Sequence, residues 1–576
     1  MGNLVNKIVA SKFWWVILLV ILLAVNYLAS SFHARFDLTK EKRYTLTKAT
    51  KDLLRGLDSD VQIDVFLKGD FPAKFRKLTN SVSEFLGLLK ESNSSKINYT
   101  FTSPLDEIPE ANGRKYADTI ESMGGFYINL KSQLKESESS SIVYPYALIK
   151  YKGKTELVTL FSVPAISSPT NDLPEKVINS AEALLEYQFA KTLDKMTEEK
   201  APAIIYATGN GQPTDYRVYD IEQTLTQDYR FGPVDISKNQ IPGEADVLLI
   251  VKPTVQFTEE LKLKVDQFVM RGGKVVWFID NLIAEQDSLR FTTETIAFDR
   301  DLNITDQLFR YGVRINPDLV MSLDCDYMPF AVGGTQENPQ FEFLKWNYYP
   351  LFGSPNNNPV TKNMGLVMGR FVNSIDTIAT PGITKTVLLS SSPNSRIIST
   401  PALISLNENK NAPQDAKFTR NNIPVAMLLE GKFTSLFRNK ISKSQLDSLA
   451  GYGIPFMEMN KEPGKMIVVG DGDILLNEVS PKEGPLRMGT NFYTMGSQYE
   501  YQFANKEFLL NCIEYLVNKP GIIETRNKDI VLRLLDSQKV KAQKSTWQFM
   551  NIALPILLVL LVGWIYQQVR KRKYAA

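Results

Sequence analysis

The chain has 576 residues, which at about 100–200 residues per domain predicts about three to five folded units. Its 66 lysines and arginines nearly balance 63 aspartates and glutamates, and this balance excludes a polybasic protein that binds nucleic acid through charge. With 44% apolar and 22% charged residues the bulk of the chain is globular, and a mean hydropathy of −0.16 excludes a permease with many membrane spans.

An apolar run at residues 13–32 carries no charge over about the 20 residues that a helix needs to cross a bilayer. Trp14, Trp15 and Tyr27 lie near its two ends, as aromatic residues do at membrane interfaces. A cleaved signal peptide is the alternative, but the apolar core of such a peptide is usually only about 7–15 residues long. We therefore predict an uncleaved anchor that follows a short cytoplasmic tail, residues 1–12.

A second apolar run, residues 547–567, begins at Trp547 and is followed by the basic sequence RKRK at 570–573. Because short basic tails stay in the cytoplasm, both chain ends are predicted to be cytoplasmic. Everything between the two spans is then translocated to the far side of the membrane. A juxtamembrane linker at 537–546 and a basic cytoplasmic tail at 568–576 complete this layout.

The translocated region divides into two predicted α/β domains. In the first, residues 33–200, a strand at 61–67, a helix and a strand at 97–103 form a β-α-β unit. Gly153 marks the turn of a predicted hairpin, because glycine adopts positive φ without steric cost.

The second predicted domain, residues 201–536, begins with apolar strands that alternate with amphipathic helices as far as residue 280. This alternation predicts a doubly wound parallel sheet, which we expect to resume with strands at 423–431 and 465–475. The intervening residues 281–420 contain Asn- and Pro-rich stretches and are predicted to form a loop-rich insertion.

The sequence lacks the motifs of nucleotide hydrolysis and of nucleophilic hydrolases. Lys154 lies in the one GKT sequence, but a phosphate loop would need glycine where Leu148 stands. There is no GxGxxG after a strand and no GxSxG elbow, and the one histidine, His33, lies beside the first apolar run. We therefore predict no catalytic residue, no cofactor and no metal, and energy for transport must come from another chain.

One candidate for ligand binding is the turn formed by Gly209, Asn210, Gly211 and Gln212, which follows a buried strand and precedes a helix. Its backbone N–H groups could face an anion. A tight turn between strand and helix needs glycine for its own sake, and we weigh this interpretation above an anion site.

A second candidate is the GDGD turn, which ends a later strand at the place where ligands bind in parallel sheets. Its carboxylates, Asp471 and Asp473, could hold a divalent cation, and Asp280 ends another predicted strand. Asp324 and Asp326 form a further acidic pair. Aspartate and glycine are also the usual turn formers at strand ends, and we weigh this interpretation above a metal site.

Aromatic side chains gather in the segment FEFLKWNYYPLF. Trp346, Tyr348 and Tyr349 form either a partner surface, because exposed Trp and Tyr favour interfaces, or a strand packed on the core, and the residues leave both open. The pairing of the two cysteines, Cys325 and Cys512, also stays open, although Cys512 falls on the apolar face of a predicted helix.

Several long segments between about residues 36 and 536 are distinctive: FDLTKEKRYTLT, LKVDQFVMRGGKVVWFID, YGVRINPDLVMSLDC, VVGDGD and FLLNCIEYLVNKPGIIETRNKDIVLRLLD. They resemble the gliding-motility-associated ABC-transporter auxiliary family, the GldG-type proteins. The resemblance implies a bacterial inner-membrane protein whose periplasmic region works with a separate permease and a separate cytoplasmic ATPase. It also implies an amidotransferase-like fold that has lost catalysis.

We therefore expect a non-enzymatic, substrate-binding-like auxiliary subunit of an ABC transporter linked to gliding motility, with the transported substrate left open. A structural scaffold of an envelope motility or secretion machine is the alternative. A membrane-anchored hydrolase is disfavoured, because it would need a nucleophile and a base that the residues do not offer. Nucleic-acid binding has no support, since the basic stretches lie beside the membrane.

Overall fold

The computed structural model describes residues 45–527 with gaps, the helix at 537–574, and scattered residues before position 45 (16, 19, 20, 22, 23, 26 and 37). The gaps are at 70, 72, 110–112, 126, 135–136, 162–174, 199, 285, 290–291, 336–337, 407–414 and 518–520. The predicted first span, residues 13–32, and the tail before it therefore lie almost wholly outside the described residues. The chain forms two compact units, residues 1–529 and residues 530–576.

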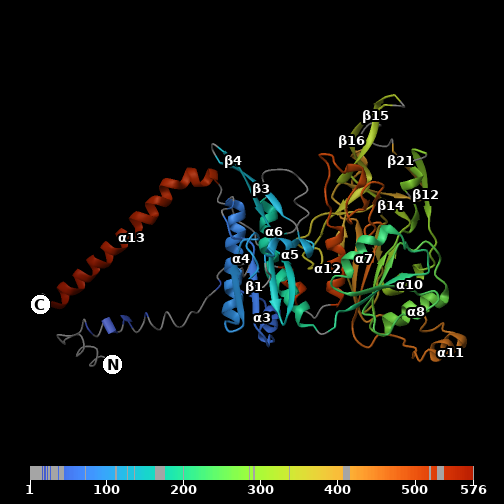
Figure 1. The fold of residues 1–576 in the computed structure, drawn as a ribbon, viewed down its shortest axis with the longest axis horizontal. Coiled ribbons are helices and arrows are strands. Elements are labelled where there is room, and N and C mark those ends of the chain that lie inside the picture. Colours follow the sequence, from blue (N-terminus) through green and yellow to red (C-terminus); the bar gives the residue numbers. More distant parts are fainter. Residues whose placement is uncertain are drawn as a thin grey trace. The chain divides into compact units, whose positions relative to one another are not determined.

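The first unit begins with a small α/β domain (Figure 1). Its elements are α3 (Lys48–Arg55), β1 (Val61–Val65), α4 (Ala73–Ser92), β2 (Ile97–Phe101), α5 (Tyr116–Ser122), β3 (Ile128–Leu134), β4 (Ser137–Val143), β5 (Tyr146–Tyr151), β6 (Lys154–Thr159) and α6 (Glu175–Thr197). The sheet order is β2-β1-β5-β6, and β1 and β2 are parallel. Helices α3, α4 and α6 share one core with this sheet.

Two local predictions in this domain are confirmed. The strand, helix and strand β1-α4-β2 form the expected β-α-β unit. The hairpin between β5 and β6 turns at Lys152 and Gly153, with φ of 50° and 75°. Two successive positive φ angles are typical of the tight turn that matches the twist of paired strands.

The second domain begins at β7 and contains a seven-stranded sheet of order β19-β22-β23-β10-β9-β7-β8. Its strands and helices are β7 (Ala203–Thr208), η2 (Tyr216–Val218), α7 (Tyr219–Leu225), β8 (Arg230–Asp235), β9 (Val247–Val251), α8 (Glu259–Met270), β10 (Lys274–Phe278), α10 (Thr305–Tyr311), β19 (Ile383–Ser390), β22 (Pro424–Gly431), α11 (Lys443–Gly451), β23 (Gly464–Val469), η4 (Phe492–Thr494), α12 (Asn505–Val517) and η5 (Ile523–Asn527). Helices α7 and α12 pack on one face of the sheet, and α8 and α10 pack on the other.

Five strands of this sheet, from β8 to β23, are parallel, whereas β22 is antiparallel to both of its neighbours, β23 and β19. The prediction of a wholly parallel sheet is therefore wrong at one edge. The reason is that a buried strand is a continuous apolar run whichever way it points, so the sequence of β22 does not encode its direction.

The predicted loop-rich insertion, residues 281–420, consists largely of short strands. They are β11 (Leu282–Ile283), β12 (Glu294–Asp299), β13 (Val313–Ile315), β14 (Asp318–Ser322), β15 (Cys325–Gly334), β16 (Pro339–Phe352), β17 (Val367–Met368), β18 (Ile375–Thr377), β20 (Ser395–Ser399) and β21 (Ala402–Ser405), with the helices α9 (Gln286–Leu289) and η3 (Asp415–Lys417). A further pair, β24 (Val479–Ser480) and β25 (Gly484–Pro485), follows β23. Each of these small sheets has two or three strands, and most of the strands are short. Short strands show little of the alternation of apolar and polar residues by which a strand is recognised in a sequence.

The three aromatic residues of β16 are buried, with exposed fractions of 0% for Trp346, 1% for Tyr348 and 0% for Tyr349. The indole N–H of Trp346 donates to the carbonyl of Ser405, and the hydroxyl of Tyr348 donates to the carbonyl of Leu403. These side chains therefore hold β21 against β16. The interpretation as a partner surface is wrong for them, because they present no area to a partner.

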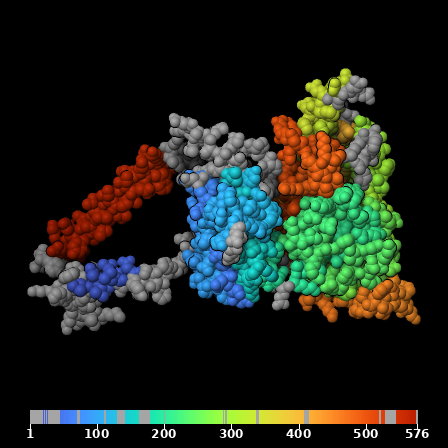
Figure 2. Space-filling model, viewed as in Figure 1, coloured from blue at the N-terminus to red at the C-terminus, as the bar shows by residue number. Residues whose placement is uncertain are grey.

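The second unit is dominated by α13 (Ser537–Tyr574), which contains an apolar stretch, Gln543–Arg572, long enough to cross a membrane. None of that stretch is buried, and Figure 2 shows its side chains exposed along the helix in red. This confirms an apolar helix at the predicted second span. The predicted linker at 537–546 is instead the first part of the same helix.

We predict that Trp346→Ala lowers the free energy of unfolding by about 3–5 kcal/mol, because truncating a buried aromatic residue leaves a cavity. Denaturant unfolding followed by circular dichroism measures this loss. Phe341→Ala, on the same strand but 58% exposed, is the matched control and should be nearly neutral. Equal effects of the two substitutions would contradict the assignment of Trp346 to the core.

Candidate functional site

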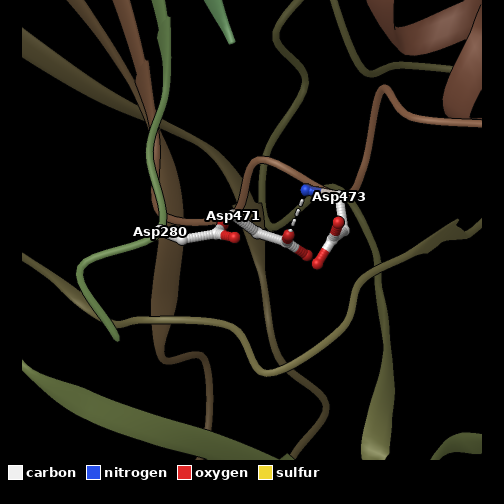
Figure 3. Close-up of side chains that lie close together, drawn as sticks. All are labelled: Asp280, Asp471 and Asp473. Carbon is white, nitrogen blue, oxygen red and sulfur yellow. Dashed lines mark hydrogen bonds between the residues drawn. The ribbon is translucent and has the colours of Figure 1, made fainter. Parts of the chain in front are cut away.

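The carboxyl ends of β9, β10 and β23 meet at one edge of the second-domain sheet, and each ends in a charged side chain. Lys252 follows β9, Asp280 follows β10, and Asp471 and Asp473 follow β23. Figure 3 shows the three aspartates with their carboxyl groups close together. Since this edge is where parallel sheets bind their ligands, it is the candidate functional site of the domain.

The three aspartates have the spacing of a metal site, but two of them already pair with the side-chain ammonium of Lys252. One carboxylate oxygen from each lies within 4.8 Å of the others. The Lys252 ammonium lies 3.0 Å from Asp280 Oδ2 and 2.7 Å from Asp473 Oδ1. A divalent ion bound to the same oxygens would compete with this buried ammonium, so the arrangement favours an internal ion cluster over a metal site.

Backbone N–H groups complete the cluster. Asp471 Oδ1 accepts from the N–H of Asp473 at 2.7 Å, and Oδ2 accepts from the N–H of Arg370 at 2.8 Å. The N–H of Gly472 donates to Asp280. The acidic side chains thus tie the GDGD turn to β10 and to the segment after β17.

Burial raises the pKa of Asp471 well above its usual value, and the carboxylates of Asp280 and Asp473 raise it further. Burial also raises the pKa of Asp280, against the lowering effect of Lys252. Carboxyl groups so close together favour retaining a proton.

A second ion pair lies beside the cluster. The Arg370 guanidinium pairs with Glu478 and stands over the ring of Tyr349, 5.3 Å from its centre. The sequence interpretation missed Arg370, Glu478 and Lys252 as members of the site. Lys252 could have been found from one feature of the sequence, a charged residue directly after an all-apolar strand. Arg370 and Glu478 lie in irregular segments that show no pattern in the sequence.

Close packing explains the glycines of the GDGD turn. A side chain at Gly472 would place its Cβ 2.6 Å from the Cβ of Lys252, and one at Gly470 would collide with the carbonyl of Asn373. Both glycines therefore admit neighbouring chain segments rather than a ligand. This supports the interpretation of GDGD as a structural turn.

In the turn at Gly209–Gln212, backbone groups are also hydrogen-bonded to other groups of the chain. Gly209 and Gly211 have φ of 105° and 73°, and the N–H of Asn210 donates to Gln212 Oε1 at 2.7 Å. The N–H groups of Thr254 and Val255 donate to the carbonyl of Asn210. Asn210 and Gln212 are buried, so this geometry favours the tight turn over an open anion site.

The acidic residues around Cys325 point to different places. Asp326 is buried and accepts from Asn491 Nδ2 at 2.7 Å. Asp324 lines a cavity of about 260 Å³ together with Lys345, Ser390–Ser392 and Asn422.

Burial raises the pKa of Cys325 to about 12, so its thiol does not form the reactive thiolate at neutral pH. Cys325 and Cys512 are both free and buried, so the structure contains no disulfide between them.

These features define a mixed α/β protein with a lysine held between two aspartates at the carboxyl edge of its main sheet, and with an apolar helix near the C-terminus. The chain belongs to the family described as an ABC-type uncharacterized transport system, whose model matches residues 201–512, more than half of its length. Residues 40–150 match a second model, a domain of unknown function.

Individual proteins resemble the chain at low identity. An uncharacterized protein of Borreliella burgdorferi is 22% identical over 441 residues, covering 74% of this chain and 78% of that protein. Among solved structures, the mmIFT52 N-terminal domain matches with 12% identity and a TM-score of 0.30, covering 55% of this chain and 99% of that one.

We predict that Gly472→Ala destabilises the protein by about 1–3 kcal/mol, because the added methyl group overpacks the contact with Lys252. The melting temperature of the purified protein checks this. Gly451→Ala, where an added Cβ meets nothing within 4 Å, is the control and should leave the melting temperature unchanged. A tolerated Gly472→Ala would show that the turn has room for a ligand.

Proposed function

We propose that the chain is a non-enzymatic, membrane-anchored auxiliary subunit of an ABC transporter that acts with a separate permease and a separate ATPase. The observation that carries the proposal is the family match over residues 201–512, which comprises the seven-stranded sheet and its insertion. The sequence has no phosphate loop, so the energy of ATP hydrolysis would come from a partner.

The absence of enzymatic activity is supported by the chemistry of the sheet edge. Lys252 fills the place between Asp280 and Asp473 where a substrate or metal would bind, and the adjacent turns are packed against the chain itself. The one histidine of the sequence, His33, lies far from this edge along the chain. A hydrolase would need an accessible nucleophile and a base, and this edge offers neither.

The membrane topology follows from the two apolar runs. With both basic tails in the cytoplasm, the two spans would place the α/β domains in the periplasm of a bacterium, anchored in the inner membrane. Helix α13 supports the second anchor. Anchors at both ends would let the protein pack against a permease within the bilayer.

Two finer parts of the proposal rest on sequence resemblance. The motifs shared with GldG-type proteins, among them FDLTKEKRYTLT and VVGDGD, extend the role to a transporter that serves gliding motility. They also connect the second domain to non-catalytic amidotransferase-like folds. Its helices on both faces of a largely parallel sheet are compatible with such a doubly wound relative.

The test is affinity purification of the full chain from native membranes in mild detergents. We expect a multi-span membrane protein and a nucleotide-binding protein to co-purify in a constant ratio. Recovery of the folded chain alone in every mild detergent would contradict the proposal.

The matched control replaces residues 547–567 by leucine while keeping Trp547 and Trp564. Such a helix still inserts, because it keeps its length and its aromatic ends, but it loses the side chains that would pack against a permease. We expect the variant to remain in the membrane and to lose both partners.

A further inference from the structure

The carboxyl edge of the seven-stranded sheet is filled at its centre and hollow beside it. At the centre, Lys252 and the GDGD turn occupy the ends of β9, β10 and β23. Because β22 is antiparallel to both of its neighbours, β22 begins and β19 ends at this same edge, where Ser390 pairs with Pro424. The cavity of about 260 Å³ lies against these two strand ends. Since such sheets bind ligands at this edge, the cavity is where a ligand can still enter.

The insertion forms the other side of the cavity. Asp324, which precedes β15, and Lys345 and Leu351 of β16 line it. The N–H of Leu351 donates to the carbonyl of Asp324 at 2.9 Å. Gly353 and Ser390 exchange two backbone hydrogen bonds, of 3.1 and 3.2 Å, which tie the insertion to β19. The cavity therefore lies wholly within the second domain, between two walls that backbone hydrogen bonds hold together.

The loop after β19 is fixed in place by its own serines. The hydroxyl of Ser391 accepts from the N–H of Ile423 at 3.1 Å, and the N–H of Ser391 donates to the carbonyl of Ile423 at 3.0 Å. The hydroxyl of Ser392 shares a hydrogen bond of 2.9 Å with that of Ser322. A wall that is already ordered loses little entropy when a ligand binds, and this favours affinity.

Two opposite charges line the cavity, those of Asp324 and Lys345, and both side chains are exposed. Burial has the largest effect on the pKa of Cys325 and raises it, and beyond that the Lys345 ammonium lowers this pKa while the Asp324 carboxylate raises it. Both charges therefore lie close to the same thiol. Among the residues that the structure describes, Asp324 takes part in no ion pair, so its carboxylate is available to a ligand.

The pair of charges selects the class of ligand. A simple anion would be repelled by Asp324, and a simple cation would be repelled by Lys345. A neutral ligand would leave both charges without a partner. A ligand that carries one positive and one negative group matches both, and charge complementarity of this kind determines which ligand a site accepts.

The rest of the lining includes an apolar wall, formed by Leu351, Pro355 and Leu366. Leu366 is 44% exposed, so covering it with an apolar group would be favourable. The cavity volume of about 260 Å³ lies just below the range of about 300–1,000 Å³ that holds drug-sized ligands. The ligand is therefore small, with an apolar part beside its two charged groups.

We propose that this cavity binds a free α-amino acid with an apolar side chain. The carboxylate of the amino acid pairs with Lys345, its ammonium pairs with Asp324, and its side chain lies against the apolar wall. Ser390 and Asn422, which also line the cavity, supply a hydroxyl and an amide that can hydrogen-bond to either charged group. Binding at this cavity requires neither a permease nor an ATPase, so its failure would leave the co-purification test untouched.

The experiment is isothermal titration calorimetry of the full chain, purified in detergent, with L-leucine and L-methionine in separate titrations. We expect one of the two to bind at a single site. The acid that lacks its ammonium and the amine that lacks its carboxylate should each bind about 10–100-fold more weakly, because each loses one charged hydrogen bond. Glucose, which is small and neutral, should not bind.

Two variants assign the charges. Asp324→Asn and Lys345→Met should each weaken binding of the amino acid about 10–100-fold, because each removes one charged partner. In Asp324→Asn the acid should then bind as tightly as the amino acid, and in Lys345→Met the amine should. Both positions are exposed, so the melting temperature should not change. Glu342→Gln is the matched control, since Glu342 is an exposed residue of β16 that is not part of the lining, and it should bind like the parent protein.

Three results would overturn the proposal. The first is that neither amino acid binds at millimolar concentration. The second is that glucose, the acid or the amine binds the parent protein as tightly as the amino acid. The third is that the folded variants Asp324→Asn and Lys345→Met bind the amino acid like the parent protein, which would place any binding outside this cavity.

Discussion

The buried ammonium of Lys252 is the interaction on which the second domain depends most. It neutralises Asp280 and Asp473 at the edge where three parallel strands end, and the carboxyl groups there bind the backbone of the GDGD turn and of the segment at Arg370. Lys252 itself has a φ of 45°, a left-handed conformation that is costly for a lysine and is kept only when its surroundings fix it. Removing the ammonium would leave buried carboxylates without a counter-charge, which is among the most destabilising changes a core can suffer.

This interaction also bears on function. In parallel sheets, the carboxyl edge is normally kept open for a ligand, with glycine turns that let the ligand approach the backbone. Here the glycines admit Lys252 and Asn373 instead, and the edge serves to hold the sheet to its insertion. The chain belongs to the family of an uncharacterized ABC-type transport system, and its apolar helix α13 is not buried against the described residues.

The sequence predicted what depends on local patterns. The β-α-β unit, the hairpin at Gly153, the strands of the sheet centre and the apolar helix near the C-terminus all follow from periodicity, turn residues and apolar length. It was wrong about the direction of β22 and the strands of the insertion, and it left the burial of Trp346 open, because all three depend on partners distant in the chain. Asp471 and Asp473 could be predicted as site residues because glycines mark their turn in the sequence. Lys252 was missed, because it belongs to the site only through the strand order, in which β9 lies between β7 and β10.

The most direct test of the Lys252 account is the binding of Mn²⁺, followed by the electron paramagnetic resonance signal of the free ion and by the melting temperature. The account predicts that the parent protein leaves millimolar Mn²⁺ free and its melting temperature unchanged, because the ammonium already occupies the site. It also predicts that Lys252→Met lowers the melting temperature and that Mn²⁺ raises it again, since Asp280 and Asp473 then lose their ammonium partner while the three carboxylates remain within 4.8 Å of one another. Stoichiometric binding of Mn²⁺ by the parent protein, lost in Asp473→Asn, would contradict it and would make this edge a metal site.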